Sequence, residues 1–185
     1  SRLRPREAAS AGIALVLANR DEGAAVRGMS ISENITLAGL RAVTTAGFIV
    51  AARERTRVAR WIEALEIRPA QPRRDYATLS GGNRQKVIFA KWLNIEPRLL
   101  VLDDPTSGVD VGARRAMYVQ IREVTAGGIP VIVASSDLED LIRLCDRVLV
   151  LVGGRVAAEL SGDAITEHRI TIEMSASADE TRGAA

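Results

Sequence analysis

The chain has 185 residues, of which 47% are hydrophobic and 3% aromatic, and its formal net charge at pH 7 is +2. This length and apolar content fit a globular domain with a sizeable core and exclude a disordered chain. The small net charge gives no argument for nucleic-acid binding, the single cysteine excludes an internal disulfide, and no apolar run approaches the ~20 residues of a membrane span.

In the first half of the chain, hydrophobic patterning predicts one buried strand followed by two helices. The polar, Arg-rich residues 1–11 are expected to be flexible, and the apolar run over 12–17 has the length of a buried strand. Ser30 and Glu33 have capping-box spacing, so a helix is expected to begin at Ser30. Residues 53–67 are amphipathic, with apolar side chains on one helical face, and predict the second helix.

The second half of the chain alternates strands with helices, which favours a mostly parallel sheet flanked by helices. A Gly153-Gly154 turn is expected to join the last two strands as a hairpin. Beyond Ser161 the pattern decays, and residues 161–185 are expected to form a disordered polar tail. The predicted helices cover about 80–95, 111–125 and 137–144, and the predicted strands cover 99–102, 130–134, 147–152 and 155–160.

Two short runs of residues carry the chemistry. Residues 79–86 (LSGGNRQK) place a Ser-Gly-Gly turn at the start of a helix, where backbone N–H groups suit a phosphate. Residues 99–105 (LLVLDDP) form a buried strand that ends in two carboxylates, and ligands of open α/β sheets bind at such strand ends. Asp103 can therefore hold the magnesium ion that accompanies a nucleotide.

In this order, and followed by Gly108-Val109-Asp110, the two runs resemble the ATP-binding cassette of ABC transporters. The resemblance implies a partial P-loop NTPase fold over about 12–160, of the α/β class, with a helical subdomain over about 30–95. No Gly-rich loop ending in Gly-Lys-Ser or Gly-Lys-Thr occurs in the sequence. We therefore expect either a piece of a cassette that starts after this Walker A loop or a degenerate cassette. By itself such a chain is expected to be inactive.

The resemblance also implies a role for each residue of the two runs. Asp104 stands where most cassettes have the Glu that activates the attacking water, and its side chain is one methylene shorter. Ser136 stands where most cassettes have a histidine, and it cannot supply a positive charge to the γ-phosphate. The implied ligands are ATP and Mg²⁺. The residues expected to contact the nucleotide are Ser80, Gly81, Gly82, Asn83, Asp110 and Ser136, with Asp103 on the metal and Asp104 as the base.

Three stretches narrow the resemblance: residues 79–87, residues 108–113, and the Ser-Ser-Asp at 135–137 without histidine. Together they look like the second cassette of the double-cassette ATPases that drive ribose-, galactose- and xylose-type importers. That family implies a cytoplasmic ATPase at the inner face of the membrane. Its partners are a second cassette, membrane permease subunits and, indirectly, a sugar-binding protein, with no nucleic acid. One departure is Ala18, which stands where this subfamily has a carboxylate.

Two other readings stay open. A degenerate cassette could act as a dimerisation or regulatory module that completes a partner's site, and the residues Ala18, Asp104 and Ser136 favour this alternative. A soluble ABC protein that acts without a permease is the other alternative. The sugar-importer-like sequence around Ser80 and Gly108 argues against it.

Overall fold

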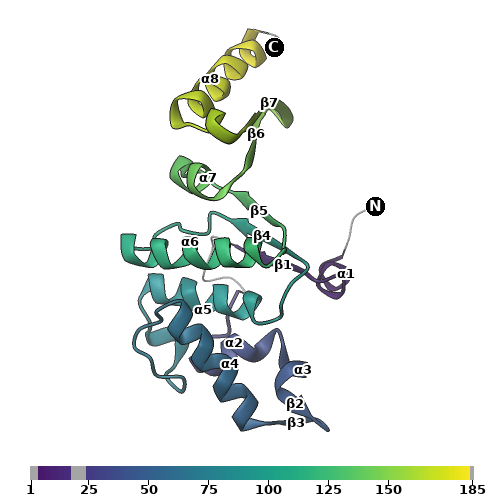
Figure 1. The fold of residues 1–185 in the computed structure, drawn as a ribbon, viewed down its shortest axis with the longest axis vertical. Helices are drawn as coiled ribbons and strands as arrows, with labels where there is room; N and C mark the ends of the chain where they lie inside the picture. Colours follow the sequence, from purple (N-terminus) through teal and green to yellow (C-terminus); the bar gives the residue numbers. More distant parts are fainter. Residues whose placement is uncertain (1–3, 18–23, 184–185) are drawn as a thin grey trace. The chain divides into compact units, whose positions relative to one another are not determined.

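The computed structural model describes residues 4–17 and 24–183, which form two compact units, Ser1–Ile132 and Val133–Ala185 (Figure 1). The expected domain over about 12–160 stays a prediction. The predicted departure at Ala18 lies outside the described residues. None of the helices in the described part of the chain has the length and apolar content that a membrane span requires.

The described chain has a three-stranded sheet with the order β1-β4-β5, of which β1 and β4 belong wholly to the first unit. β1 and β4 run parallel, with Ile13 beside Leu99 and Val16 beside Leu102, as the alternation of strands and helices predicts. Ala14, Val16, Leu100 and Leu102 are fully buried, and α5 packs against β1. The strands are β1 (Ile13–Val16), β4 (Leu99–Asp103) and β5 (Val131–Ala134).

Between β1 and β4 the chain is mostly helical, as expected for a helical subdomain. The capping box at Ser30 is present: the Ser30 N–H donates to Glu33 Oε2 at 2.7 Å, and Ser30 Oγ accepts from the Glu33 N–H at 3.3 Å. The Ser30 hydroxyl also donates to Glu33 Oε2 at 2.6 Å, and this bond is the main reason that the pKa of Glu33 is lowered. α2 packs on both α4 and α5, and α4 buries Val58, Trp61 and Ile62. The elements are α2 (Ile31–Leu37), α3 (Leu40–Val43), β2 (Thr44–Thr45), β3 (Phe48–Ile49), α4 (Ala51–Ala64), η1 (Tyr76–Thr78) and α5 (Gly81–Leu93).

Two further helices belong to the first unit. α6 (Val111–Ala126) begins where it is predicted, packs on α5, and buries Met117 and Ile121. α1 (Pro5–Ser10) lies in the segment predicted to be flexible. Its helical start has a physical cause, because proline at the first helical position has its backbone angle preset and needs no hydrogen-bond partner.

The second unit is an antiparallel hairpin covered by two helices. Val148, Val150 and Leu160 of the hairpin form its core together with Ile165 and Ile170. The expectation of a disordered tail over 161–185 is wrong for the described residues, because 162–164 form a 3-10 turn and 167–183 form a long helix. This helix exists because Ile170, 2% exposed, anchors its first turns on the hairpin, a contact that local polarity does not reveal. The elements are α7 (Leu138–Leu144), β6 (Arg147–Val152), β7 (Arg155–Ser161), η2 (Gly162–Ala164) and α8 (Glu167–Gly183).

Candidate functional site

The strand β4 delivers two adjacent carboxylates into a tight turn, residues 103–107, which we call the carboxylate turn. Asp103 is the exposed last residue of β4. Asp104 follows in the left-handed region with φ of 41°, which Asp tolerates better than most residues. The Ser107 N–H donates to the Asp104 carbonyl at 3.1 Å, and the Val109 N–H donates to the Thr106 carbonyl at 3.2 Å. Short-range backbone bonds therefore hold both carboxylates at the end of the sheet.

The start of α5 forms the second part of the candidate site, and we call residues 80–83 the signature turn. Ser80 is the N-cap residue by position, as predicted, but its side chain makes no capping hydrogen bond to the helix backbone. Ser80 Oγ instead accepts from Asn83 Nδ2 at 3.0 Å. The first N–H groups of a helix have no partner within the helix. The signature turn therefore offers these donors, and the exposed Gly81, to an anion.

Two segments far apart in the sequence meet at Gly82. A Cβ atom built on Gly82 would lie 3.5 Å from Asp110 Oδ2 and 3.8 Å from Val109 Cγ1. Asp110 is also the N-cap of α6, where its Oδ1 accepts from the Ala113 N–H at 2.9 Å. That hydrogen bond is the main reason that the pKa of Asp110 is lowered, and the charge of Lys86 adds to it. The residues predicted from two separate motifs thus form one contiguous surface.

The helix α5 contacts the carboxylate turn as well as the signature turn. Gln85 Nε2 donates to the Pro105 carbonyl at 3.2 Å, and Gln85 is only 1% exposed. Lys86, 6% exposed, donates from Nζ to the Glu66 carbonyl at 3.1 Å, and burial lowers the pKa of this lysine. Sequence reasoning missed both residues. The available signal was spacing, because they follow Gly82 by three and four residues and so share its helical face.

The predicted site residues are not all brought together by the described structure. In the first unit, Asp110 meets the signature turn at Gly82, and α5 joins that turn to the carboxylate turn. Ser136 belongs to the second unit, where it is exposed just after β5. Its neighbour Ser135 donates to Asp140 Oδ2 at 2.8 Å and accepts from the Asp137 N–H at 3.1 Å. The nucleotide role of Ser136 therefore stays a prediction.

The donor set at β4 fits a magnesium ion that arrives with a nucleotide. Within the described residues no group of three or more histidine, cysteine or carboxylate side chains could hold a metal by itself. Protein-bound Mg²⁺ commonly keeps several waters and binds one or two carboxylates together with substrate phosphates. An exposed Asp103 at the strand end suits that mode of binding.

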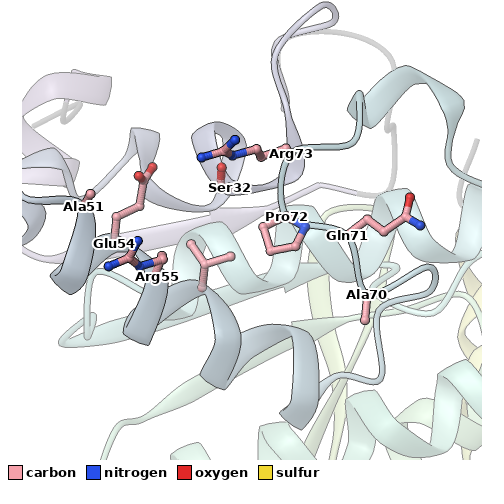
Figure 2. Close-up of a pocket in the computed structure, with 9 residues that line it drawn as sticks. Ser32, Ala51, Glu54, Arg55, Ala70, Gln71, Pro72 and Arg73 are labelled. Atoms are coloured by element: carbon pink, nitrogen blue, oxygen red, sulfur yellow. The ribbon is translucent and has the colours of Figure 1, made fainter.

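A separate pocket of about 460 Å³ lies between α2, α4 and residues 70–73 (Figure 2). Glu54, Arg55 and Arg73 bring charge to a pocket that also has apolar walls, and the Arg73 side chain extends toward Ser32. None of the residues predicted to contact the nucleotide lines it. This pocket is therefore distinct from the signature and carboxylate turns.

Known structures and sequences share this architecture. A dimeric ATP-binding cassette in a post-hydrolysis state, bound to ADP and Pi, superposes with a TM-score of 0.72 at 20% identity, over 86% of this chain and 68% of that one. The cbiO1 protein of Clostridium perfringens superposes with a TM-score of 0.68 at 22% identity, over 93% and 66% of the two chains. At these identities the likeness establishes the fold, and it confirms the predicted cassette architecture.

A family model described as "ABC transporter" matches residues 5–107. The ribose import ATP-binding protein RbsA of Geobacillus kaustophilus is 42% identical over 166 residues, which are 90% of this chain and 34% of that protein. A putative ribose/galactose/methyl galactoside import ATP-binding protein of Agrobacterium fabrum is 40% identical, over 90% and 33%. The chain spans about a third of the length of these curated relatives.

Proposed function

This chain belongs to the ABC transporter family, and on that premise we propose that it supplies the signature turn and the metal-binding strand end of a sugar-import ATPase. The relatives that carry import names, RbsA of Geobacillus kaustophilus and of Streptomyces coelicolor among them, support the sugar class. The substrate of the complete transporter and its ATP hydrolysis are part of the proposal.

One observation supports the proposal: the signature turn offers the first backbone N–H groups of α5, which have no partner within the helix, and it lies beside the run at residues 108–110. Ser80 Oγ does not cap the helix, Gly82 has no side chain to block an approaching group, and Asp110 lies next to it. Backbone N–H groups and the positive end of a helix dipole favour an anion at this position. We assign the turn to the γ-phosphate of an ATP molecule that an opposing cassette holds.

The carboxylate turn supplies the other half of the chemistry. Asp103 would bind the magnesium ion, which neutralises developing charge on the β- and γ-phosphates. Asp104 would accept the proton of the attacking water, which requires an approach of about 3 Å. Because Asp is one methylene shorter than Glu, a shortfall of ~1 Å could slow the step by on the order of a hundredfold.

The partners follow from the same proposal. A second cassette would hold the ATP that the signature turn contacts, and permease subunits would couple hydrolysis to import at the inner face of the membrane. A sugar-binding protein would deliver the substrate to the permease. The short side chain of Asp104 also favours a second candidate function, a degenerate cassette that completes a partner's site without rapid turnover of its own.

The experiment is the variant Ser80→Arg in the gene product that contains this chain. We expect ATPase turnover at the composite site to be abolished while nucleotide binding remains, because a bulky side chain blocks the approach of the phosphate to the turn. Ala126→Arg is the matched control, since it adds the same side chain at an exposed position near the end of α6. Unchanged turnover in a folded Ser80→Arg protein would mean that the turn is only the start of a helix.

A further inference from the structure

We propose that Asn83 is a positioning residue that holds the Ser80 hydroxyl as a hydrogen-bond donor and ties it to residues 66–68. The inference rests on the proposed function, because it assigns the Ser80 hydroxyl to a phosphate. It also revises the expectation that Asn83 itself contacts the nucleotide.

The hydrogen bonds of the Asn83 side chain fix the orientation of its amide. Asn83 Oδ1 accepts from the Arg68 N–H at 2.7 Å, and Asn83 Nδ2 donates to Ser80 Oγ at 3.0 Å. A backbone N–H can only donate, so it must face the amide oxygen. The NH₂ group is then left to face Ser80, so the bond to Arg68 determines that Asn83 is the donor in its bond to Ser80.

This polarity decides what the Ser80 hydroxyl can do. A serine hydroxyl has one hydrogen to donate and two lone pairs that accept. Because Ser80 Oγ is the acceptor in its bond with Asn83 Nδ2, the hydroxyl hydrogen is left to donate to a ligand. A phosphate oxygen at the turn requires a donor and not an acceptor, so the Asn83 amide selects the productive state of the hydroxyl.

A second side chain fixes the same segment to α5. Lys86 Nζ donates to the Glu66 carbonyl at 3.1 Å, and Lys86 is almost fully buried. Residues 66–68 follow the buried Leu65, which is the C-cap of α4, and the Ile67 N–H donates to the Ile62 carbonyl of α4 at 2.9 Å. The position of the Ser80 hydroxyl is therefore set from the packed end of α4, through Asn83.

The test is a double-mutant cycle on ATPase turnover in the gene product that contains this chain. A hydrogen bond to a charged group is strong enough that Ser80→Ala should lower kcat by about tenfold or more. Asn83→Ala should lower kcat to a similar extent with little change in KM. In the Ser80→Ala background, Asn83→Ala should have no further effect, since its target is already gone. If Asn83 had a purely structural role, the fold-losses in kcat of the two single variants would instead multiply in the double variant.

Asn83→Asp is the conservative variant that keeps the proposal testable if Asn83→Ala does not fold. Aspartate can still accept from the Arg68 N–H, so the tie to α4 remains. It has no donor for Ser80 and would accept the serine hydrogen, so kcat should fall although the melting temperature is retained. If Ser80→Ala lowers kcat but both Asn83 variants leave it unchanged, or multiply fully with it, the positioning role is wrong and the proposed function stands. If Ser80→Ala and Ser80→Arg both leave turnover unchanged, the proposed function fails first.

Discussion

The signature turn and the carboxylate turn are held in place by different kinds of bond. In the carboxylate turn, backbone bonds span three residues, from Ser107 to Asp104 and from Val109 to Thr106. In the signature turn, side chains of α5 reach fifteen and twenty residues back along the chain, from Asn83 to Arg68 and from Lys86 to Glu66. The carboxylate turn is fixed mainly by its own backbone, with one added bond from Gln85 Nε2 to the Pro105 carbonyl, whereas the signature turn is fixed by a distant segment.

The two turns should therefore be sensitive to different kinds of substitution. A turn that is closed mainly by local backbone bonds depends chiefly on the backbone conformation of its own few residues. A turn that is held by side chains from another segment can lose its working geometry without any change in its own residues. We therefore expect the carboxylate turn to respond to changes of reach and backbone preference, and the signature turn to respond to small steric changes.

The largest expected effect tests the signature turn with a single methyl group, in the variant Gly82→Ala. Alanine stabilises a helix by about 0.5–1 kcal/mol relative to glycine. The new Cβ would meet Asp110 Oδ2 at 3.5 Å, an ordinary contact. The free energy of unfolding should therefore be unchanged or higher. Turnover should fall by on the order of a hundredfold, because a displacement of ~1 Å at the phosphate has that effect.

The matched control for this variant is Gly112→Ala in the first turn of α6. Its Cβ would lie 3.4 Å from Asp110 Oδ1, so the steric setting and the helix propensity are similar. Chemical denaturation and steady-state ATPase assays of both variants separate stability from chemistry. Equal turnover in the two variants would contradict a role of Gly82 in the approach of the phosphate.

The second-largest expected effect is a change of about tenfold in turnover, and it concerns the carboxylate turn. Asp104→Glu should raise turnover, because it extends the proposed base toward the attacking water, and tenfold corresponds to about 1.4 kcal/mol of transition-state stabilisation. It should also lower stability by up to roughly 1 kcal/mol, because the left-handed backbone at φ of 41° favours Asp over Glu. Asp104→Asn is the control that keeps the backbone preference and removes the base.

Pre-steady-state ATP hydrolysis, together with a denaturation curve, measures both parts of this prediction. A flat rate in Asp104→Glu alongside a lost rate in Asp104→Asn would contradict the account of a slow base. The limiting step would then lie in cassette closure or product release.

Much of the fold could be predicted from sequence because its signals are local. The capping box at Ser30, the apolar run of β4 and the glycine pair between β6 and β7 each specify an element through neighbouring residues. The family resemblance, carried by two short motifs, is confirmed by the family model and by the cassette architecture. The residue roles at the site are proposals argued from its geometry.

The parts that sequence reasoning missed depend on contacts between distant residues. Helix α8 has a weak pattern of its own and depends on Ile170 packing against the hairpin of β6 and β7. In the site, the partners of Asn83 and Lys86 are backbone groups of residues 68 and 66, and no side-chain type at those positions marks the contact. A backbone partner leaves no signal in the sequence, so the bonds that attach the signature turn could be identified only in the structure.

The smallest expected effect concerns Asp110, which adjoins the signature turn and caps α6. The hydrogen bond from the Ala113 N–H holds the pKa of Asp110 below its ordinary value of 3.8. Its ionised form therefore stabilises the fold above about pH 4, and this contribution disappears as the pH falls through the lowered pKa.

Asp110→Asn keeps a capping side chain of similar quality but does not titrate. At pH 7 the two proteins should have similar stability, whereas below about pH 4 the parent should lose stability more steeply than the variant. Urea unfolding at several pH values measures the two slopes, with Asp110→Ala as the control that lacks a cap at every pH. Parallel slopes for the parent and Asp110→Asn would show that the Asp110 charge has no part in the stability of this junction, and that its value lies only in its contact with Gly82.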